Sequence, residues 1–268
     1  MRRLVIAAAP ALMSQPVPAQ EPVRLHAAGS LRAALTEAAQ AFTAATGVAV
    51  APVFGASGLL RERIAAGEAA EVFASADLGH PRALAEAGLA GPVVLFARNE
   101  LCAFARPEVG ASGDTLLARM LDPVVRLGTS TPKADPSGDY AWQVFARAEA
   151  VAPGARATLE AKALQLTGGP ASPRGPEGRN LYGRLLASGA ADIFLAYCTN
   201  AAAIAAEEPA IAQIRLPEAL TVGPEYGLTV MTRASPNAGR LAMFILSREG
   251  QAILLRHGFA APGLPREE

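Results

Sequence analysis

Four points in the sequence place a serine, or another small or polar residue, where a strand-like run gives way to a helix-like run. Three are "HAAGSLRAAL" at Ser30, "FGASGLL" at Ser57 and "DPSGDYAW" at Ser137, and the fourth is "PEGRNLYGRLL". The first turn of a helix carries unpaired N–H groups and a partial positive charge, so it binds an anion without a cationic side chain. Serine is also a favoured N-cap residue. The four points therefore predict either an anion site or ordinary helix caps.

The sequence offers no arrangement typical of an enzyme. Its three histidines are His26, His80 and His257, and none stands in an order with serine, aspartate or cysteine that predicts a nucleophile and its base. No phosphate-binding loop of the Walker type and no strict dinucleotide fingerprint occurs. The carboxylates are scattered, without the spacing of a metal site. We therefore expect a binding protein without catalytic residues, cofactor or metal cation.

The composition is that of a globular chain with a large core. Of its 268 residues, 51% are hydrophobic and 18% are charged, which suits one large domain or two moderate ones. Basic and acidic residues number 24 each, and this balance argues against a nucleic-acid-binding surface.

The first 19 residues have the pattern of a secretory signal peptide. A short basic start, Met1-Arg2-Arg3, precedes an apolar stretch, and Val17-Pro18-Ala19 offers the small residues that a signal peptidase prefers. The apolar stretch is too short to span a bilayer. Cleavage after Ala19 removes two arginines, so the mature chain has a net charge of −2. We expect a soluble protein exported to the periplasm.

Apolar runs and helical patterns alternate from residue 23 onward, as in strands joined by helices. The spacing predicts strands at residues 23–28, 48–54, 71–75, 93–97, 101–105, 124–129, 192–198 and 225–232. It predicts helices between residue 30 and Gly47, and at residues 59–66, 81–87, 116–121, 140–148, 155–166, 181–187, 238–246 and 249–258. Residues 167–178, rich in glycine and proline, are expected to form a loop. Two α/β lobes, each with a mostly parallel sheet flanked by helices, fit this order best.

Five stretches, taken in order, resemble the periplasmic molybdate-binding proteins of ABC importers. They are "VRLHAAGSLRAAL", "VFGASGLLRERIAAGEAAEVFASAD", "DPSGDYA", "IFLAYCTNA" and "YGLTVMTRASPNAGRLAMFILSREGQAILLRHGF". The resemblance covers essentially the whole mature chain. It implies the type II periplasmic-binding fold, with a ligand cleft between a first lobe of residues 20–103 and 227–268 and a second of 104–226. It also implies a monomer that binds molybdate or tungstate and delivers it to an inner-membrane permease with its ATPase.

The resemblance further implies which residues bind the oxyanion through neutral donors. The two serine hydroxyls fall on Ser30 and Ser57, a backbone amide falls on Ser137, and the tyrosine hydroxyl falls on Tyr197. A second backbone amide falls on Arg179. Further residues close to these five are Gly29, Ala56, Gly138, Asp139, Asn180 and Asn200.

Two of these positions depart from the family pattern, because Arg179 and Asp139 stand where the family has apolar side chains. The guanidinium of Arg179 could enter the cleft and pair with an anion, or it could point to solvent while only its amide binds. Arg179 and Asp139 could also pair with each other. The leading alternative is therefore the same fold with another ligand, sulfate or a small organic anion, clamped by Arg179. The effector domain of a transcription regulator is a further alternative, but the export signal stands where its DNA-binding segment belongs. An enzyme on this scaffold is another.

The two cysteines, Cys102 and Cys198, allow two interpretations. In an oxidising compartment they could form a disulfide. They could equally be two small buried hydrophobes in separate strands. Their spacing fits no metal-binding motif.

Overall fold

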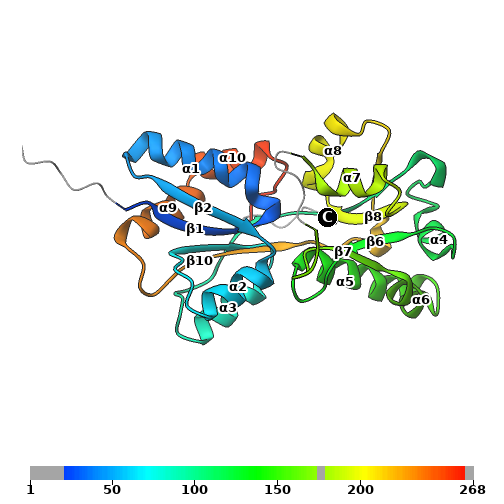
Figure 1. The fold of residues 1–268 in the computed structure, drawn as a ribbon, viewed down its shortest axis with the longest axis horizontal. Helices are drawn as coiled ribbons and strands as arrows, with labels where there is room; N and C mark the ends of the chain where they lie inside the picture. The colour runs from blue at the N-terminus through cyan, green and yellow to red at the C-terminus, as the bar shows by residue number, and fades with distance from the viewer. Residues whose placement is uncertain (1–20, 174–178, 263–268) are drawn as a thin grey trace, which may run out of the picture.

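The structure is a computed structural model that describes residues 21–173 and 179–262. It has two lobes, each a five-stranded sheet with helices packed on it, lying side by side along the long axis of the molecule (Figure 1). The two-lobe α/β fold expected from the sequence is confirmed. The signal peptide expected at residues 1–19 lies outside the described residues, as do residues 174–178 of the expected loop.

The first sheet has the strand order β2-β1-β3-β10-β4. Strand β1 lies parallel to both β2 and β3, whereas β10 is antiparallel to β3 and β4. The sheet is therefore mixed rather than mostly parallel. Its strands are β1 (Val23–Ala28), β2 (Val50–Gly55), β3 (Val72–Ser75), β4 (Val94–Arg98) and β10 (Glu225–Val230). The helices of this lobe are α1 (Arg32–Thr46), α2 (Ser57–Ala65), α3 (Gly79–Glu86), α9 (Pro236–Leu246) and α10 (Arg248–Arg256).

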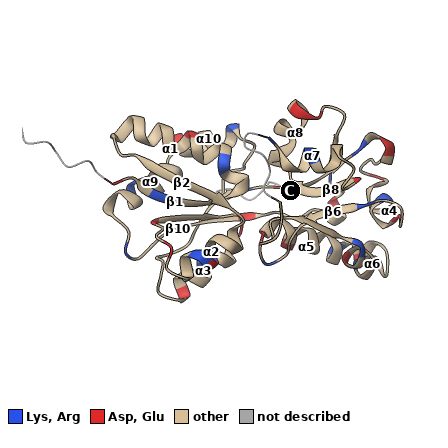
Figure 2. Cartoon of the chain, viewed as in Figure 1, with Lys and Arg blue, Asp and Glu red and all other residues tan. Residues whose placement is uncertain are grey.

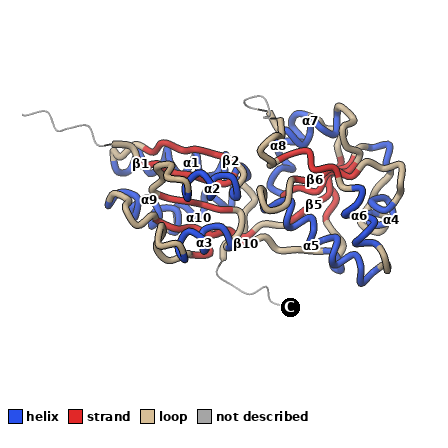
Figure 3. Tube along the Cα trace, turned by 60° about the horizontal axis from the view of Figure 1, so that its bottom comes forward, coloured by secondary structure: helices blue, strands red, loops and turns tan. Residues whose placement is uncertain are grey.

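The second sheet has the order β7-β6-β8-β5-β9 and is mixed in the same way. Strand β6 lies parallel to β7 and β8, and β5 is antiparallel to β8 and β9. Its strands are β5 (Leu101–Ala105), β6 (Leu127–Ser130), β7 (Leu164–Thr167), β8 (Ile193–Tyr197) and β9 (Ala212–Arg215). The helices are α4 (Leu116–Leu121), α5 (Pro136–Val151), α6 (Ala155–Lys162), α7 (Leu181–Ala187) and α8 (Ala201–Glu207). Figure 3 shows the strands gathered in two groups with helices around each.

The chain passes between the two sheets twice, once between β4 and β5 and once in the segment before β10. All of β5 pairs within the second sheet, although the sequence-based division assigned residues 101–103 to the first lobe. All of β10, including Glu225 and Tyr226, pairs within the first sheet. Among the described residues, the first lobe thus combines residues 23–98 with residues 225–262.

Helix α1 illustrates how the spacing of apolar residues in the sequence predicts a helix. Its buried side chains recur every three or four residues, so one face of the helix covers the sheet. The helix ends at Gly47, whose φ of 73° is the left-handed conformation that glycine adopts without steric cost. The buried residues of this face are Ala34, Leu35, Ala38, Ala39 and Phe42.

Three elements were wrong or missing in the sequence-based layout. The single helix expected at residues 155–166 is helix α6 followed by strand β7, which pairs with β6 at the edge of the sheet. Helix α8 and the edge strand β9 were not expected. Edge strands are short and half exposed, so pairing with a neighbour defines them more than their own apolar pattern does.

Charged residues are spread over both lobes without forming a single-sign face in the view of Figure 2. Among the described residues, no helix is long and apolar enough to cross a membrane.

Candidate ligand-binding site

Ser30 and Ser57 follow the carboxyl ends of two neighbouring parallel strands. Ala28, the last residue of β1, pairs with Gly55, the last residue of β2, and each serine lies two residues further on. Ser30 lies in the short 3-10 helix Gly29–Leu31, and Ser57 is the first residue of α2. Because the carboxyl ends of parallel strands meet at one edge of a sheet, this edge is where an α/β protein places its ligand.

The Ser30 hydroxyl contacts a tyrosine that the sequence did not single out. Its Oγ lies 3.0 Å from Tyr226 Oη, and Asn99 Nδ2 donates a hydrogen bond to the same Oη at 3.2 Å. Tyr226 lies in β10, and its ring centroid is 5.7 Å from that of Tyr197 in the second lobe. Nothing in the local sequence marks Tyr226 or Asn99, since the contact joins residues 196 positions apart.

Ser57 is 1% exposed, and its Oγ accepts a hydrogen bond from the backbone N–H of Ala76 at 3.1 Å. This bond ties the start of α2 to the end of β3. An accepted bond leaves the hydroxyl hydrogen of Ser57 available for a ligand oxygen.

The second lobe places two hydroxyls in the same kind of position. Ser137 lies in the first turn of α5, and Tyr197 is the last residue of β8. Ser137 is 0% exposed and Tyr197 is 2% exposed, yet neither Ser137 Oγ nor Tyr197 Oη has a hydrogen-bond partner among the described residues. A buried hydroxyl without a partner costs about 1–3 kcal/mol. Burial also raises the pKa of the Tyr197 phenol well above its ordinary value, so the hydroxyl keeps its proton and remains a donor.

The backbone amide of Ser137 is already engaged. It donates to Oδ1 of Asp135 at 3.1 Å, and Asp135 is the N-cap residue of α5. Burial raises the pKa of the Asp135 carboxyl to about 6, because water no longer solvates its charge. The side chain lies against Gly168, where an added Cβ would come within 2.4 Å of it. Sequence reasoning missed Asp135, although aspartate before proline and serine is a helix-start signal.

At the fourth of the predicted helix starts, the Arg179 side chain contacts two carboxylates at the end of α8. Arg179 Nε lies 3.3 Å from Glu207 Oε2, and its Nη2 lies 3.4 Å from Glu208 Oε1, with half of the side chain exposed. The amide of Asn180 donates to the Glu207 carboxylate at 2.9 Å, and the Asn180 side chain caps Gly183 N at 3.1 Å. Of the possibilities left open for Arg179, the pairing with Asp139 does not occur among the described residues, and the guanidinium is half exposed at the surface.

Asp139 instead accepts a hydrogen bond from the amide of Lys133 at 2.9 Å. Burial raises the pKa of its carboxyl. The negative charge of Asp77, in the first lobe, raises this pKa as well.

The other residues predicted to lie close to the site contact the backbone and side chains around it. Asn200 Nδ2 donates to the carbonyl of Tyr197 at 3.0 Å, and its Oδ1 accepts from Asn180 Nδ2 at 3.1 Å. Gly138 packs so closely that an added Cβ would lie 2.6 Å from the carbonyl oxygen of Ser130. Gly29 is exposed, and Ala56 is the N-cap of α2.

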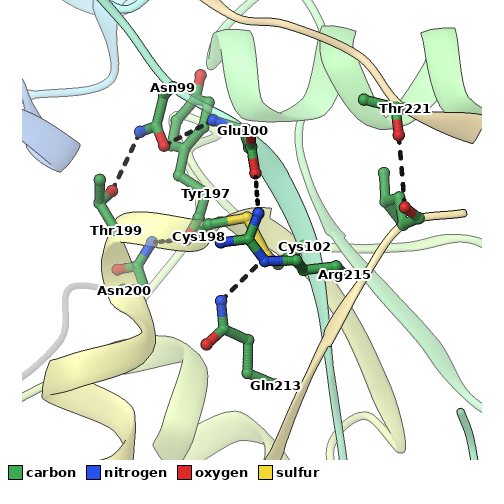
Figure 4. The surroundings of a disulfide bond; sticks show 11 residues. Asn99, Glu100, Cys102, Tyr197, Cys198, Thr199, Asn200, Gln213, Arg215 and Thr221 are labelled. Carbon is green, nitrogen blue, oxygen red and sulfur yellow. Dashed lines mark hydrogen bonds and ion pairs between the residues drawn. A yellow bond between two sulfur atoms is a disulfide. The ribbon is translucent and has the colours of Figure 1, made fainter. Parts of the chain in front are cut away.

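The two cysteines form a disulfide, so the alternative of two separate buried thiols is wrong (Figure 4). Cys102 lies in β5, and Cys198 directly follows Tyr197. The amide of Cys198 also donates to the carbonyl of Glu100 at 2.8 Å. The bond therefore fixes the end of β8, where the Tyr197 hydroxyl lies. Among the described residues, no group of three or more His, Cys, Asp or Glu side chains could hold a metal ion.

Two α/β lobes, each a mixed sheet with helices packed on it, define a protein of the type II periplasmic-binding architecture. The chain belongs to the family of bacterial extracellular solute-binding proteins, whose model matches residues 23–260. Members of this family are the solute receptors of transporters rather than enzymes, and they work with an ABC permease and its ATPase.

Comparisons with individual proteins agree with this family. The chain is 36% identical over 211 residues to an uncharacterized protein of Pasteurella multocida (strain Pm70), covering 78% of this chain and 87% of the relative. It is 28% identical over 242 residues to the molybdate-binding protein ModA of Mycobacterium tuberculosis (strain ATCC 25618 / H37Rv), covering 89% and 84%. The periplasmic molybdate-binding protein of Azotobacter vinelandii superposes with a TM-score of 0.70 at 21% identity, covering 90% and 99%.

Other structures with this fold include proteins described as sulfate-binding, iron-bound or bound to fructose 6-phosphate. The fold alone therefore leaves the ligand open.

Proposed function

We propose that the protein captures a tetrahedral oxyanion, molybdate or tungstate, between its lobes and delivers it to an ABC permease. The observation that carries the proposal is the pair of buried hydroxyls of Ser137 and Tyr197, which have no partner among the described residues. A relative named as molybdate-binding, at 28% identity over 89% of the chain, supports the choice of anion.

A doubly charged oxyanion that enters a dry site must exchange its whole water shell for fixed donors. In this proposal, Ser30 and Ser57 provide hydroxyls from the first lobe, and Ser137 and Tyr197 provide hydroxyls from the second. Ser137 acts through its hydroxyl because its amide is bound to Asp135. The site thus uses neutral dipoles, and closure of the lobes brings the two sets of donors together.

An ionised Asp135 carboxylate would repel an anionic ligand. Its pKa is already raised to about 6, and a bound anion raises that pKa further because like charges repel. Asp135 therefore takes up a proton when the oxyanion binds near neutral pH. In its protonated form it no longer repels the ligand and provides one more O–H donor.

The alternative ligand, sulfate or a small organic anion clamped by Arg179, finds less support. The guanidinium is ion-paired with Glu207 and Glu208, and both contacts would have to break before it could enter the cleft. The position of the Arg179 amide as a donor remains part of the proposal.

Calorimetry with molybdate, tungstate, sulfate and small carboxylates tests the proposal. We expect binding heat with molybdate or tungstate, and a 5- to 150-fold loss of affinity, about 1–3 kcal/mol, in Ser137→Ala and in Tyr197→Phe. The matched control is Ser188→Ala, an exposed serine at the end of α7. Absence of heat with both metal oxyanions would refute the choice of ligand. Unchanged affinity in both site variants would place the ligand elsewhere.

A further inference from the structure

The two lobes contact each other directly at the first turn of α2. The backbone N–H of Gly58, in the first lobe, donates a hydrogen bond to the carbonyl oxygen of Ala134, in the second, at 2.9 Å. A second bond between the lobes runs from the N–H of Glu225 to Tyr140 Oη at 3.1 Å. In this conformation the two lobes are thus in direct contact at the start of α2 and at the start of β10.

Only glycine fits at position 58 in this conformation. A Cβ there would lie 2.3 Å from the carbonyl oxygen of Lys133, 2.7 Å from that of Ala134 and 3.0 Å from the Ala134 carbonyl carbon. All three are backbone atoms, so no side-chain rotation relieves the overlap. The shortest of these distances is more than 1 Å below ordinary van der Waals contact between carbon and oxygen.

The opposing turn is itself held in place and cannot easily retreat. Lys133 is the one described non-glycine residue with a positive φ, at 67°, and its amide is bound by the Asp139 carboxylate at 2.9 Å. The amide of Asp135 donates to the carbonyl of Thr131 at 2.9 Å, which closes the turn. A side chain at position 58 would therefore push the lobes apart before it displaced this turn.

The contact lies beside donors of both lobes. Gly58 directly follows Ser57, and Ala134 precedes Ser137 by three residues along the chain. The separation of the first-lobe and second-lobe hydroxyls is thus set where Gly58 touches the 133–134 turn. We propose that Gly58 is a positioning residue that permits full lobe closure, and that any side chain there holds the two donor sets apart. This inference rests on the proposed function for its effect on ligand affinity.

The test compares Gly58→Ala with Gly239→Ala. Both glycines lie near the start of a helix, so alanine changes helix propensity equally in the two variants. An added Cβ at Gly239 meets no atom within 4 Å. We measure the radius of gyration by small-angle X-ray scattering, without ligand and with saturating molybdate, and the molybdate affinity by calorimetry.

We expect Gly58→Ala to have a larger radius of gyration than the wild-type protein in molybdate and to bind it at least tenfold more weakly. Gly239→Ala should match the wild type in both. If Gly58→Ala closes to the wild-type radius with wild-type affinity, the inference is wrong. If the wild type itself gives no heat with molybdate, the proposed ligand is wrong. The inference about closure is then tested with the anion that does give heat among tungstate, sulfate and the small carboxylates, and in that anion Gly58→Ala must again have a larger radius of gyration than the wild type.

Discussion

Replacing Asp135 by asparagine should stabilise the protein, and increasingly so as the pH rises. Asparagine keeps the oxygen that accepts the Ser137 amide, so the cap of α5 is preserved. What the substitution removes is the charge. Burial raises the pKa of Asp135 from 3.8 to about 6, so the folded protein binds this proton more tightly than the unfolded chain does.

The direction in which the free energy of unfolding changes with pH follows from proton linkage. Where the folded state binds more protons than the unfolded state, the free energy of unfolding falls as the pH rises. The stabilising contribution of protonated Asp135 is complete below about pH 4 and is lost by the time the pH passes 6. A difference of about two pKa units corresponds to about 3 kcal/mol, which is an upper value because a buried site relaxes around its charge. In Asp135→Asn this loss does not occur.

Urea or thermal unfolding between pH 4 and pH 7.5 measures the effect. The difference in unfolding free energy between Asp135→Asn and the wild type should grow through the window from pH 4 to pH 6 and then level off. Near neutral pH it should approach about 3 kcal/mol, or several degrees in Tm for a chain of this size. Asp114→Asn, at an exposed aspartate, should show no such growth. A difference that is constant across this pH range, or that shrinks as the pH rises, would refute the account of Asp135 as a buried carboxyl without a cationic partner.

Two further outcomes are expected. The disulfide joins residues 96 positions apart. Its loss in the Cys102→Ser, Cys198→Ser double variant should therefore lower the free energy of unfolding by about 2–5 kcal/mol. This prediction is wrong if the denaturation curves of the oxidised wild type and the double variant coincide. Ser57→Ala removes both the acceptor for the Ala76 N–H and a proposed donor to the ligand. The affinity for molybdate, measured by calorimetry, should fall 5- to 150-fold. An unchanged affinity would exclude Ser57 from the site.

The sequence predicted the positions of those candidate residues that have a local cause. Ser30, Ser57 and Ser137 stand where an apolar strand pattern stops and a helix pattern starts, and this change of period can be read within ten residues. Their placement at the ends of strands follows from that pattern. Tyr197, which was singled out by the family resemblance and not by this pattern, is the last residue of β8.

The parts that were missed depend on contacts between distant segments. Tyr226 and Asn99 meet Ser30 only because β10 returns to the first sheet, and no local pattern reports that. The direction of the Arg179 side chain depends on Glu207, the last residue of a helix that the sequence pattern did not predict, and on Glu208, which follows it. The burial of Asp135 likewise arises from packing against Gly168.

The position of β10 in the first sheet has a consequence for the order in which the two lobes fold during synthesis. In the first sheet β10 lies between β3 and β4, so these two strands have no pairing with each other and wait for a strand made more than 120 residues later. The second sheet draws all of its strands from one continuous stretch, residues 101–215. As the chain is synthesised amino end first, the second lobe can complete its sheet while the first sheet still lacks β10. The contacts of Tyr226 with Ser30 and Tyr197 form last, and a chain that ends before residue 225 would contain one complete sheet and an incomplete candidate site.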